Sequence, residues 1–96
     1  VLINNAGLSY RSVVEHVDSD ERQAQLDVNF LAPMELIRRV LPAMRAKKAG
    51  RILSISSVGG MMAMPTMGVY SASKFALEGS TEALGTNVGV RVLKFL

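Results

Sequence analysis

The 96-residue sequence contains no cysteine and no tryptophan, and it has a single histidine. The absence of cysteine excludes disulfides, thiolate metal sites and thiol-based catalysis. The histidine, His16, has no partner at a metal-ligand spacing, so we interpret it as a loop or surface residue. No apolar run approaches the roughly 18 residues that a membrane-spanning helix needs, so we expect no membrane span.

The first residues also lack the basic-then-apolar pattern of a secretory signal peptide. A cytoplasmic location is therefore the default expectation. Hydrophobic residues make up 49% of the chain and charged residues 20%, which is typical of a globular domain. The length suffices for one such domain.

The net charge is only +3, but basic residues concentrate in one stretch. Such a cluster can bind phosphate, or it can be the solvated end of a helix, where the helix dipole stabilises cations. No aromatic residues interleave with the charges, as single-strand binding requires. We therefore favour the solvated helix end and expect no nucleic-acid partner. The residues of the cluster are Arg38, Arg39, Arg45, Lys47, Lys48 and Arg51.

Apolar patterns and helix or strand breakers divide the chain into alternating elements. Short apolar runs predict strands over residues 1–4, 51–57 and 90–96. A three- and four-residue apolar repeat predicts a long helix that begins after Asp18, with Glu21 at the capping-box position, and ends at Gly50. A second helix is predicted over residues 70–84. The order favours a parallel sheet with right-handed crossovers. We predict an α/β fold, a partial Rossmann-like doubly wound parallel sheet.

Pro33 lies inside the apolar repeat of the first helix. Proline has no N–H group, so it cannot donate to the carbonyl of Asn29, four residues earlier, and we expect a kink there. The freed carbonyl is suited to hold a water molecule. Alternatively, Pro33 is a tolerated kink without a function.

Tyr70 and Lys74 are four residues apart, on the same face of the second predicted helix. A free tyrosine ionises near pH 10, and an ammonium group within about 4–6 Å stabilises the phenolate, which favours general acid/base catalysis near neutral pH. The spacing alone also fits an ordinary surface pair. Ser57 ends the second predicted strand, at the edge where open α/β sheets bind ligands. Alternatively, Ser54, Ser56 and Ser57 satisfy backbone groups at the strand end.

Four elements occur together in one order: Asn4-Asn5-Ala6-Gly7 after a strand, Asp27-Val28-Asn29 in a helix, Ser57, and Tyr70-Ser71-Ala72-Ser73-Lys74 thirteen residues after Ser57. They resemble the NNAG motif, the helix asparagine and the Ser…Tyr-x-x-x-Lys active site of the short-chain dehydrogenase/reductase family. The resemblance extends from residue 1 to about Leu84.

The resemblance implies a role for each matching residue. Tyr70 is expected to be the general acid in carbonyl reduction and the general base in alcohol oxidation. Lys74 is expected to favour the phenolate and to bind the nicotinamide ribose, and Ser57 to orient the reacting oxygen. Asn29 is expected to anchor a water that links Lys74 to solvent. The cofactor, NAD or NADP, is expected to lie against Asn5, Ala6 and Gly7, and also against Tyr70 and Lys74.

The sequence also departs from the family's pattern. It contains no glycine-rich phosphate loop and no residue that selects between NAD and NADP. We therefore interpret residues 1–96 as a partial NAD(P)-binding Rossmann-like catalytic domain, lacking the N-terminal phosphate-binding half and the C-terminal substrate region.

The function implied by the resemblance is hydride transfer between NAD(P) and a small-molecule carbonyl or secondary-alcohol substrate. Four methionines between Ser57 and Tyr70 suggest a lipophilic substrate, or else ordinary core packing; they are Met61, Met62, Met64 and Met67. The full-length form is expected to be a homo-oligomer. The alternative is a truncated, non-catalytic fragment that packs with a full-length relative through its long helices.

Overall fold

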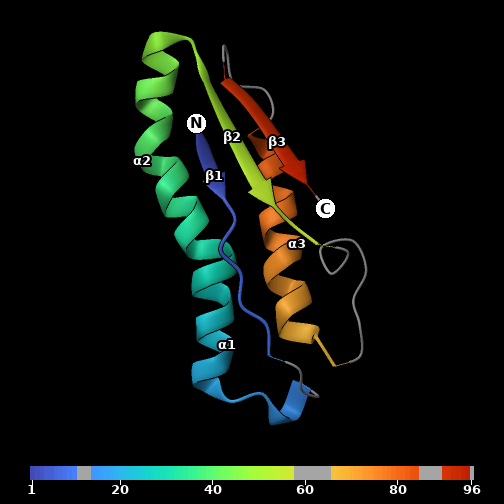
Figure 1. Ribbon diagram of the computed structural model, residues 1–96. Coiled ribbons are helices and arrows are strands. Elements are labelled where there is room, and N and C mark those ends of the chain that lie inside the picture. Colours follow the sequence, from blue (N-terminus) through green and yellow to red (C-terminus); the bar gives the residue numbers. More distant parts are fainter. Residues whose placement is uncertain (11–13, 58–65, 85–89, 96) are drawn as a thin grey trace.

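The computed structural model describes residues 1–10, 14–57, 66–84 and 90–95. In chain order its elements are β1 (Leu2–Asn4), the 3-10 helix η1 (Val14–His16), α1 (Ser19–Leu26), the π-helical segment η2 (Asp27–Leu31), α2 (Ala32–Lys47), β2 (Gly50–Ile55), α3 (Gly68–Ala83) and β3 (Val90–Phe95). The described strands form one parallel sheet in the order β1-β2-β3. Figure 1 shows the rod of α1, η2 and α2 running alongside the sheet, and both this rod and α3 pack on the same face of the sheet. The predicted partial Rossmann-like α/β fold is confirmed.

The two faces of the sheet have different surroundings. Side chains alternate between the faces along each strand, and one face packs on the helices. On the opposite face Ile3 and Leu93 remain 56% and 48% exposed. Leu84, just after α3, packs against the buried core, so both α2 and the end of α3 contribute to one layer. The centre of this core consists of Ile37, Leu41, Ile52 and Val90.

The first predicted helix is a continuous helical run from Ser19 to Lys47. Asp18 is its N-cap, as predicted, and accepts a hydrogen bond from the second helical residue at 2.8 Å. Just before Pro33 the run widens into η2, where the N–H of Ala32 bonds to the carbonyl of Asp27, five residues back. The distortion expected at Pro33 therefore takes the form of one wide turn.

The end of this helix differs from the sequence prediction. The helix ends at Lys47, and Lys48 takes the left-handed conformation with φ 53° that closes it. Gly50 does not end the helix but begins β2. The reason for a glycine there is contact: a Cβ at Gly50 would lie 2.5 Å from the side chain of Met44. The glycine allows the strand to start directly against the last turns of α2.

The second predicted helix begins at Gly68, two residues before Tyr70, and its N-cap, Met67, makes no side-chain capping bond. Tyr70 therefore lies in an uncapped first turn.

His16 is exposed in η1, which confirms its interpretation as a surface residue. Among the described helices, none combines the length and apolarity needed to cross a membrane. Within the same residues, no cluster of three or more His, Cys, Asp or Glu side chains could hold a metal ion.

Candidate active site

The candidate site lies where the carboxyl ends of β1 and β2 meet the first turns of α3. This is the edge at which open α/β sheets bind ligands. The segment after β1 passes here with Asn5, Ala6 and Gly7 exposed. A Cβ placed on Gly7 would lie 3.9 Å from Lys74 Nζ and 3.7 Å from Asn29 Oδ1. These are ordinary contact distances, so the backbone of Gly7 passes close to both the Lys74 ammonium and the Asn29 amide.

Lys74 is the buried charge of this site, with only 4% of its surface exposed. Its Nζ donates a hydrogen bond of 3.1 Å to the carbonyl of Ile55, the last residue of β2. No carboxylate among the described residues forms an ion pair with it. Burial lowers the pKa of the Lys74 ammonium below its ordinary value of 10.5. The ammonium is thus held by a neutral carbonyl and keeps donor capacity for another group.

Tyr70 lies one helical turn before Lys74 on α3 and is half-buried. Lys74 Nζ is 5.8 Å from the centre of the Tyr70 ring, within the range of a cation–π contact. The predicted spacing on one helix face has therefore brought the two side chains together. Because Lys74 is buried, the pair differs from a solvated pair on a helix surface.

Asn29 is fully buried in η2 and binds the segment after β1 with both ends of its amide. Its Oδ1 accepts from the N–H of Leu8 at 2.8 Å, and its Nδ2 donates to the carbonyl of Leu8 at 2.7 Å. Nδ2 also donates to Ser73 Oγ at 3.1 Å. The side chain of the predicted helix asparagine is thus a connector between the β1 loop and α3.

Ser57 follows β2 by two residues and is half-buried. Its chain position is at the same edge of the sheet as the Ile55 carbonyl that Lys74 contacts. The predicted role of its hydroxyl stays a prediction. Met61, Met62 and Met64, for which the sequence left a role toward a lipophilic substrate and ordinary core packing both open, lie outside the described residues.

Two buried residues of the site were not identified from the sequence. Gln25, one turn before Asn29, is fully buried, and its Oε1 accepts from the N–H of Tyr10 at 3.2 Å. Together Gln25 and Asn29 hold alternate residues of the loop after β1. Ser73 is also fully buried, and its Oγ donates to the carbonyl of Tyr70 at 2.6 Å. The only signal for Gln25 was its four-residue spacing from Asn29, and for Ser73 its place inside the Tyr-x-x-x-Lys motif.

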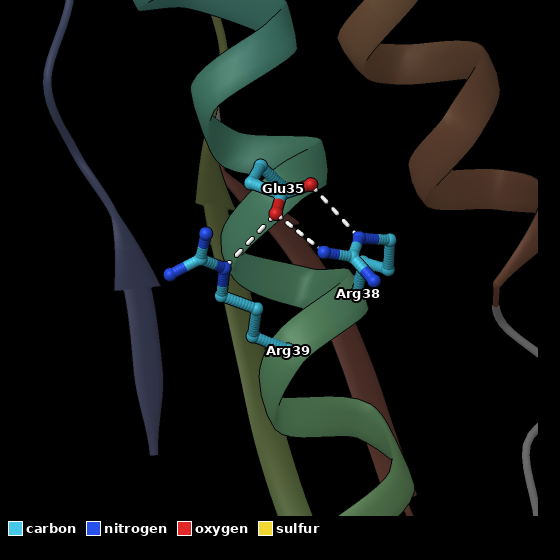
Figure 2. A network of polar contacts seen from close by, with 3 residues as sticks. All are labelled: Glu35, Arg38 and Arg39. Atoms are coloured by element: carbon cyan, nitrogen blue, oxygen red, sulfur yellow. Dashed lines mark hydrogen bonds and ion pairs between the residues drawn. The ribbon is translucent and has the colours of Figure 1, made fainter.

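The basic cluster expected at the end of the first helix does not belong to this site. Arg38 and Arg39 both bind Glu35 on the surface of α2, with contacts of 2.6 and 2.9 Å, as Figure 2 shows. These hydrogen bonds lower the pKa of the Glu35 carboxyl to about 2.

Two hollows of about 410 and 420 Å³ lie at the amino ends of the strands, around Gly50. They are at the opposite edge of the sheet from Lys74.

Comparisons with known proteins agree with this geometry. The family model described as short chain dehydrogenase matches residues 1–94. The 3-ketodihydrosphingosine reductase of Bacteroides thetaiotaomicron is 46% identical over 88 residues, which are 92% of this chain and 33% of that protein.

Solved structures give the same result. A 4-hydroxyisoleucine dehydrogenase complexed with NADH superposes with a TM-score of 0.89 at 38% identity, covering 97% of this chain and 43% of that one. A gluconate 5-dehydrogenase from Burkholderia cenocepacia J2315, in complex with NADP and tartrate, gives a TM-score of 0.92 at 28% identity, covering 97% of this chain and 38% of that one. The chain therefore spans well under half the length of each of these proteins.

Proposed function

The chain belongs to the short-chain dehydrogenase family, and we propose that it carries the proton-transfer site of an oxidoreductase acting on a small-molecule carbonyl or secondary alcohol with a nicotinamide cofactor. Proteins of similar sequence and fold are named dehydrogenases or reductases, and several are solved with NADH or NADP. Either cofactor is compatible with the residues present.

The observation that carries the proposal is the contact between the half-buried Tyr70 and the buried Lys74. A protonated lysine 5.8 Å from the phenol ring stabilises the negative charge that develops when the phenol loses its proton. The low exposure of Lys74 strengthens this interaction, because less water screens it. A surface pair at the same helical spacing lacks this advantage.

Proton transfer then follows from the two side chains. In carbonyl reduction Tyr70 Oη gives its proton to the substrate oxygen, and in alcohol oxidation it takes the proton back. Lys74 stabilises the phenolate that remains after donation. The nicotinamide, when bound, supplies or accepts the hydride.

The residues around Lys74 fit such a cofactor. Only one acceptor, the Ile55 carbonyl, bonds Lys74 Nζ among the described residues, and an ammonium group has three donors. The backbone of Gly7 passes close to this group. Lys74 would therefore bind the hydroxyls of the nicotinamide ribose, with Tyr70 beside them. Asn5, Ala6 and Gly7 would present exposed backbone to the cofactor.

Asn29 and Ser57 complete the proposed site. In α-helical register the backbone carbonyl of Asn29 would pair with the N–H of residue 33, but Pro33 has no N–H. In the wide turn of η2 this carbonyl would bind a water that passes protons between Lys74 and solvent. The hydroxyl of Ser57, at the carboxyl end of β2, would orient the substrate oxygen.

The second candidate function is a non-catalytic segment that packs on a longer relative through its long helices. The chain spans 33% of the Bacteroides thetaiotaomicron reductase. Homo-oligomerisation of the catalytic form and a lipophilic substrate are further parts of the proposal.

One experiment separates the two functions. The protein is mixed with NADH or NADPH and a panel of ketones of graded polarity, turnover is followed by loss of the reduced cofactor, and cofactor binding is measured by calorimetry. Ketone-dependent turnover supports the oxidoreductase. Absence of both binding and turnover, together with co-purification with a longer relative, would favour the packing segment instead.

A further inference from the structure

A short series of hydrogen bonds connects three segments that are distant in the sequence. Leu8, after β1, is bound through both backbone groups by Asn29 in η2. Asn29 Nδ2 donates to Ser73 Oγ, 44 residues later, at 3.1 Å. Ser73 Oγ in turn donates to the carbonyl of Tyr70 at 2.6 Å. This series of hydrogen bonds therefore ends on the backbone carbonyl of Tyr70, the proposed catalytic residue.

The donors and acceptors of this series are matched without ambiguity. The two hydrogens of Asn29 Nδ2 go to the Leu8 carbonyl and to Ser73, and its Oδ1 accepts from the Leu8 N–H. Turning the amide over would place its NH2 group against the Leu8 N–H. Because the one hydroxyl hydrogen of Ser73 is used on Tyr70, its oxygen is free to accept from Asn29. The direction of the series is fixed from Asn29 to Tyr70.

The first turn of α3 needs such an anchor. The first N–H groups of any helix have no partner within the helix, and this helix has no side-chain cap at Met67. Uncapped first turns fray at a low free-energy cost. Tyr70 lies in that turn, whereas Lys74 is one turn further along and is tied to the Ile55 carbonyl. Of the proposed pair, the tyrosine is the member with the weaker local support.

We propose that Ser73 is a positioning residue that holds the first turn of α3 against η2 and so keeps the Tyr70 phenol in reach of Lys74. The inference rests on the proposed function of Tyr70. Ser73 touches neither substrate nor cofactor in this role; it acts through the Tyr70 carbonyl. Its hydroxyl links the position of the tyrosine to the same asparagine that holds the loop after β1.

The matched control is Ser71, on the same turn of α3. It is 2% exposed, like Ser73 a buried serine, but its Oγ has no hydrogen-bond partner among the described residues. Ser73→Ala and Ser71→Ala each delete one buried oxygen atom. A general packing defect affects both variants alike, whereas loss of the anchor affects only Ser73→Ala.

The first readout is amide hydrogen exchange, which needs no cofactor. Ser73→Ala is expected to speed exchange at the amides of residues 71–74 by roughly threefold to tenfold, the factor for losing one hydrogen bond, while Ser71→Ala leaves these amides unchanged. In an Asn29→Ala background, Ser73→Ala should add little further acceleration of exchange, because the series of hydrogen bonds from Leu8 to Tyr70 is already broken. Equal effects of the two serine variants, or acceleration spread evenly over all helices, would overturn the proposal.

The second readout is turnover of the active protein. Ser73→Ala is expected to lower kcat by a similar factor with KM for the substrate unchanged, since binding groups stay in place. An unchanged kcat in a variant with faster exchange would overturn the catalytic part of the proposal. If instead Tyr70→Phe retained turnover, the proposed function itself would fail, and the exchange experiment would still decide whether Ser73 anchors the turn.

Discussion

Lys74 Nζ donates a hydrogen bond of 3.1 Å to the carbonyl oxygen of Ile55, the last residue of β2. The bond joins α3 to the carboxyl end of the central strand of the sheet. It also fixes a buried ammonium without a carboxylate partner among the described residues. The position of the lysine is therefore set by the sheet, and its charge is available to the neighbouring Tyr70.

Burial of this charge predicts a distinct pH dependence of stability. The pKa of Lys74 is lowered in the folded state, by desolvation. Between that lowered value and 10.5, the unfolded chain holds a proton at Lys74 that the folded chain has released, so the free energy of unfolding rises with pH in this window. Lys74→Met removes this contribution.

We expect denaturant unfolding to show that the parent protein gains stability relative to Lys74→Met as the pH rises toward 10.5. The comparison between the two proteins cancels the other groups that titrate in the same range. A stability difference that is independent of pH, or that moves in the opposite direction, would show that Lys74 is not desolvated.

Replacement of Asn29 should be costly because three hydrogen bonds end on its buried amide. Asn29→Ala leaves the N–H and carbonyl of Leu8 without these partners, and a loss of about 2–4 kcal/mol in unfolding free energy is expected. Gln23→Ala, on the exposed surface of α1, is the control and should change stability little. Chemical denaturation of both variants measures the difference. Equal, small effects would contradict the connector role of Asn29.

Two glycines should respond in opposite ways to alanine. At Gly50 a Cβ would lie 2.5 Å from Met44 side-chain atoms, so Gly50→Ala forces a rearrangement and should destabilise the protein by about 1–3 kcal/mol. At Gly79, inside α3, nothing lies within 4 Å of the new Cβ. Gly79→Ala should stabilise the helix by about 0.5–1 kcal/mol. If thermal unfolding showed that both variants change the stability in the same direction, the close contact between Gly50 and Met44 at the start of β2 would be contradicted.

Glu35 gives a prediction at acid pH. Its pKa of about 2 lies below the ordinary 4.5, because Arg38 and Arg39 bind its ionised form (Figure 2). The folded state therefore has a contribution that is complete above 4.5 and is lost as the pH falls toward about 2. The three side chains are solvent-exposed, so high salt should weaken the effect. NMR titration of the carboxyl carbon should give a low midpoint that rises with salt. A midpoint near 4.5 at low salt would contradict the contacts.

The alternation of elements could be predicted from the sequence because its signals are local, whereas the roles of the site residues rest on the family resemblance and stay predictions. Apolar periodicity predicted the strands and helices, and the four-residue step between Tyr70 and Lys74 predicted that the two side chains meet. The wide turn at η2 was foreseen only as a distortion, since a missing N–H at Pro33 does not determine how the helix adapts.

Features that depend on contacts distant in the sequence could not be predicted. The role of Gly50 follows from how closely β2 approaches Met44, and the left-handed cap at Lys48 moves the end of the helix to Lys47. The Ser73 and Gln25 hydrogen bonds follow from the packing of the loop after β1 between two helices. Serine and glutamine are common helix residues, so nothing local distinguished these two.

The central claim is that Tyr70 transfers the proton. The most direct test compares Tyr70→Phe with Tyr10→Phe, which removes the only other phenol of the chain. In the active protein, Tyr70→Phe is expected to lower kcat by at least about a hundredfold, the scale of general acid–base catalysis, with the dissociation constant of the nicotinamide cofactor nearly unchanged. The Tyr10→Phe variant should have the same kcat as the parent protein. Retained turnover in Tyr70→Phe, with the cofactor still bound, would contradict the account.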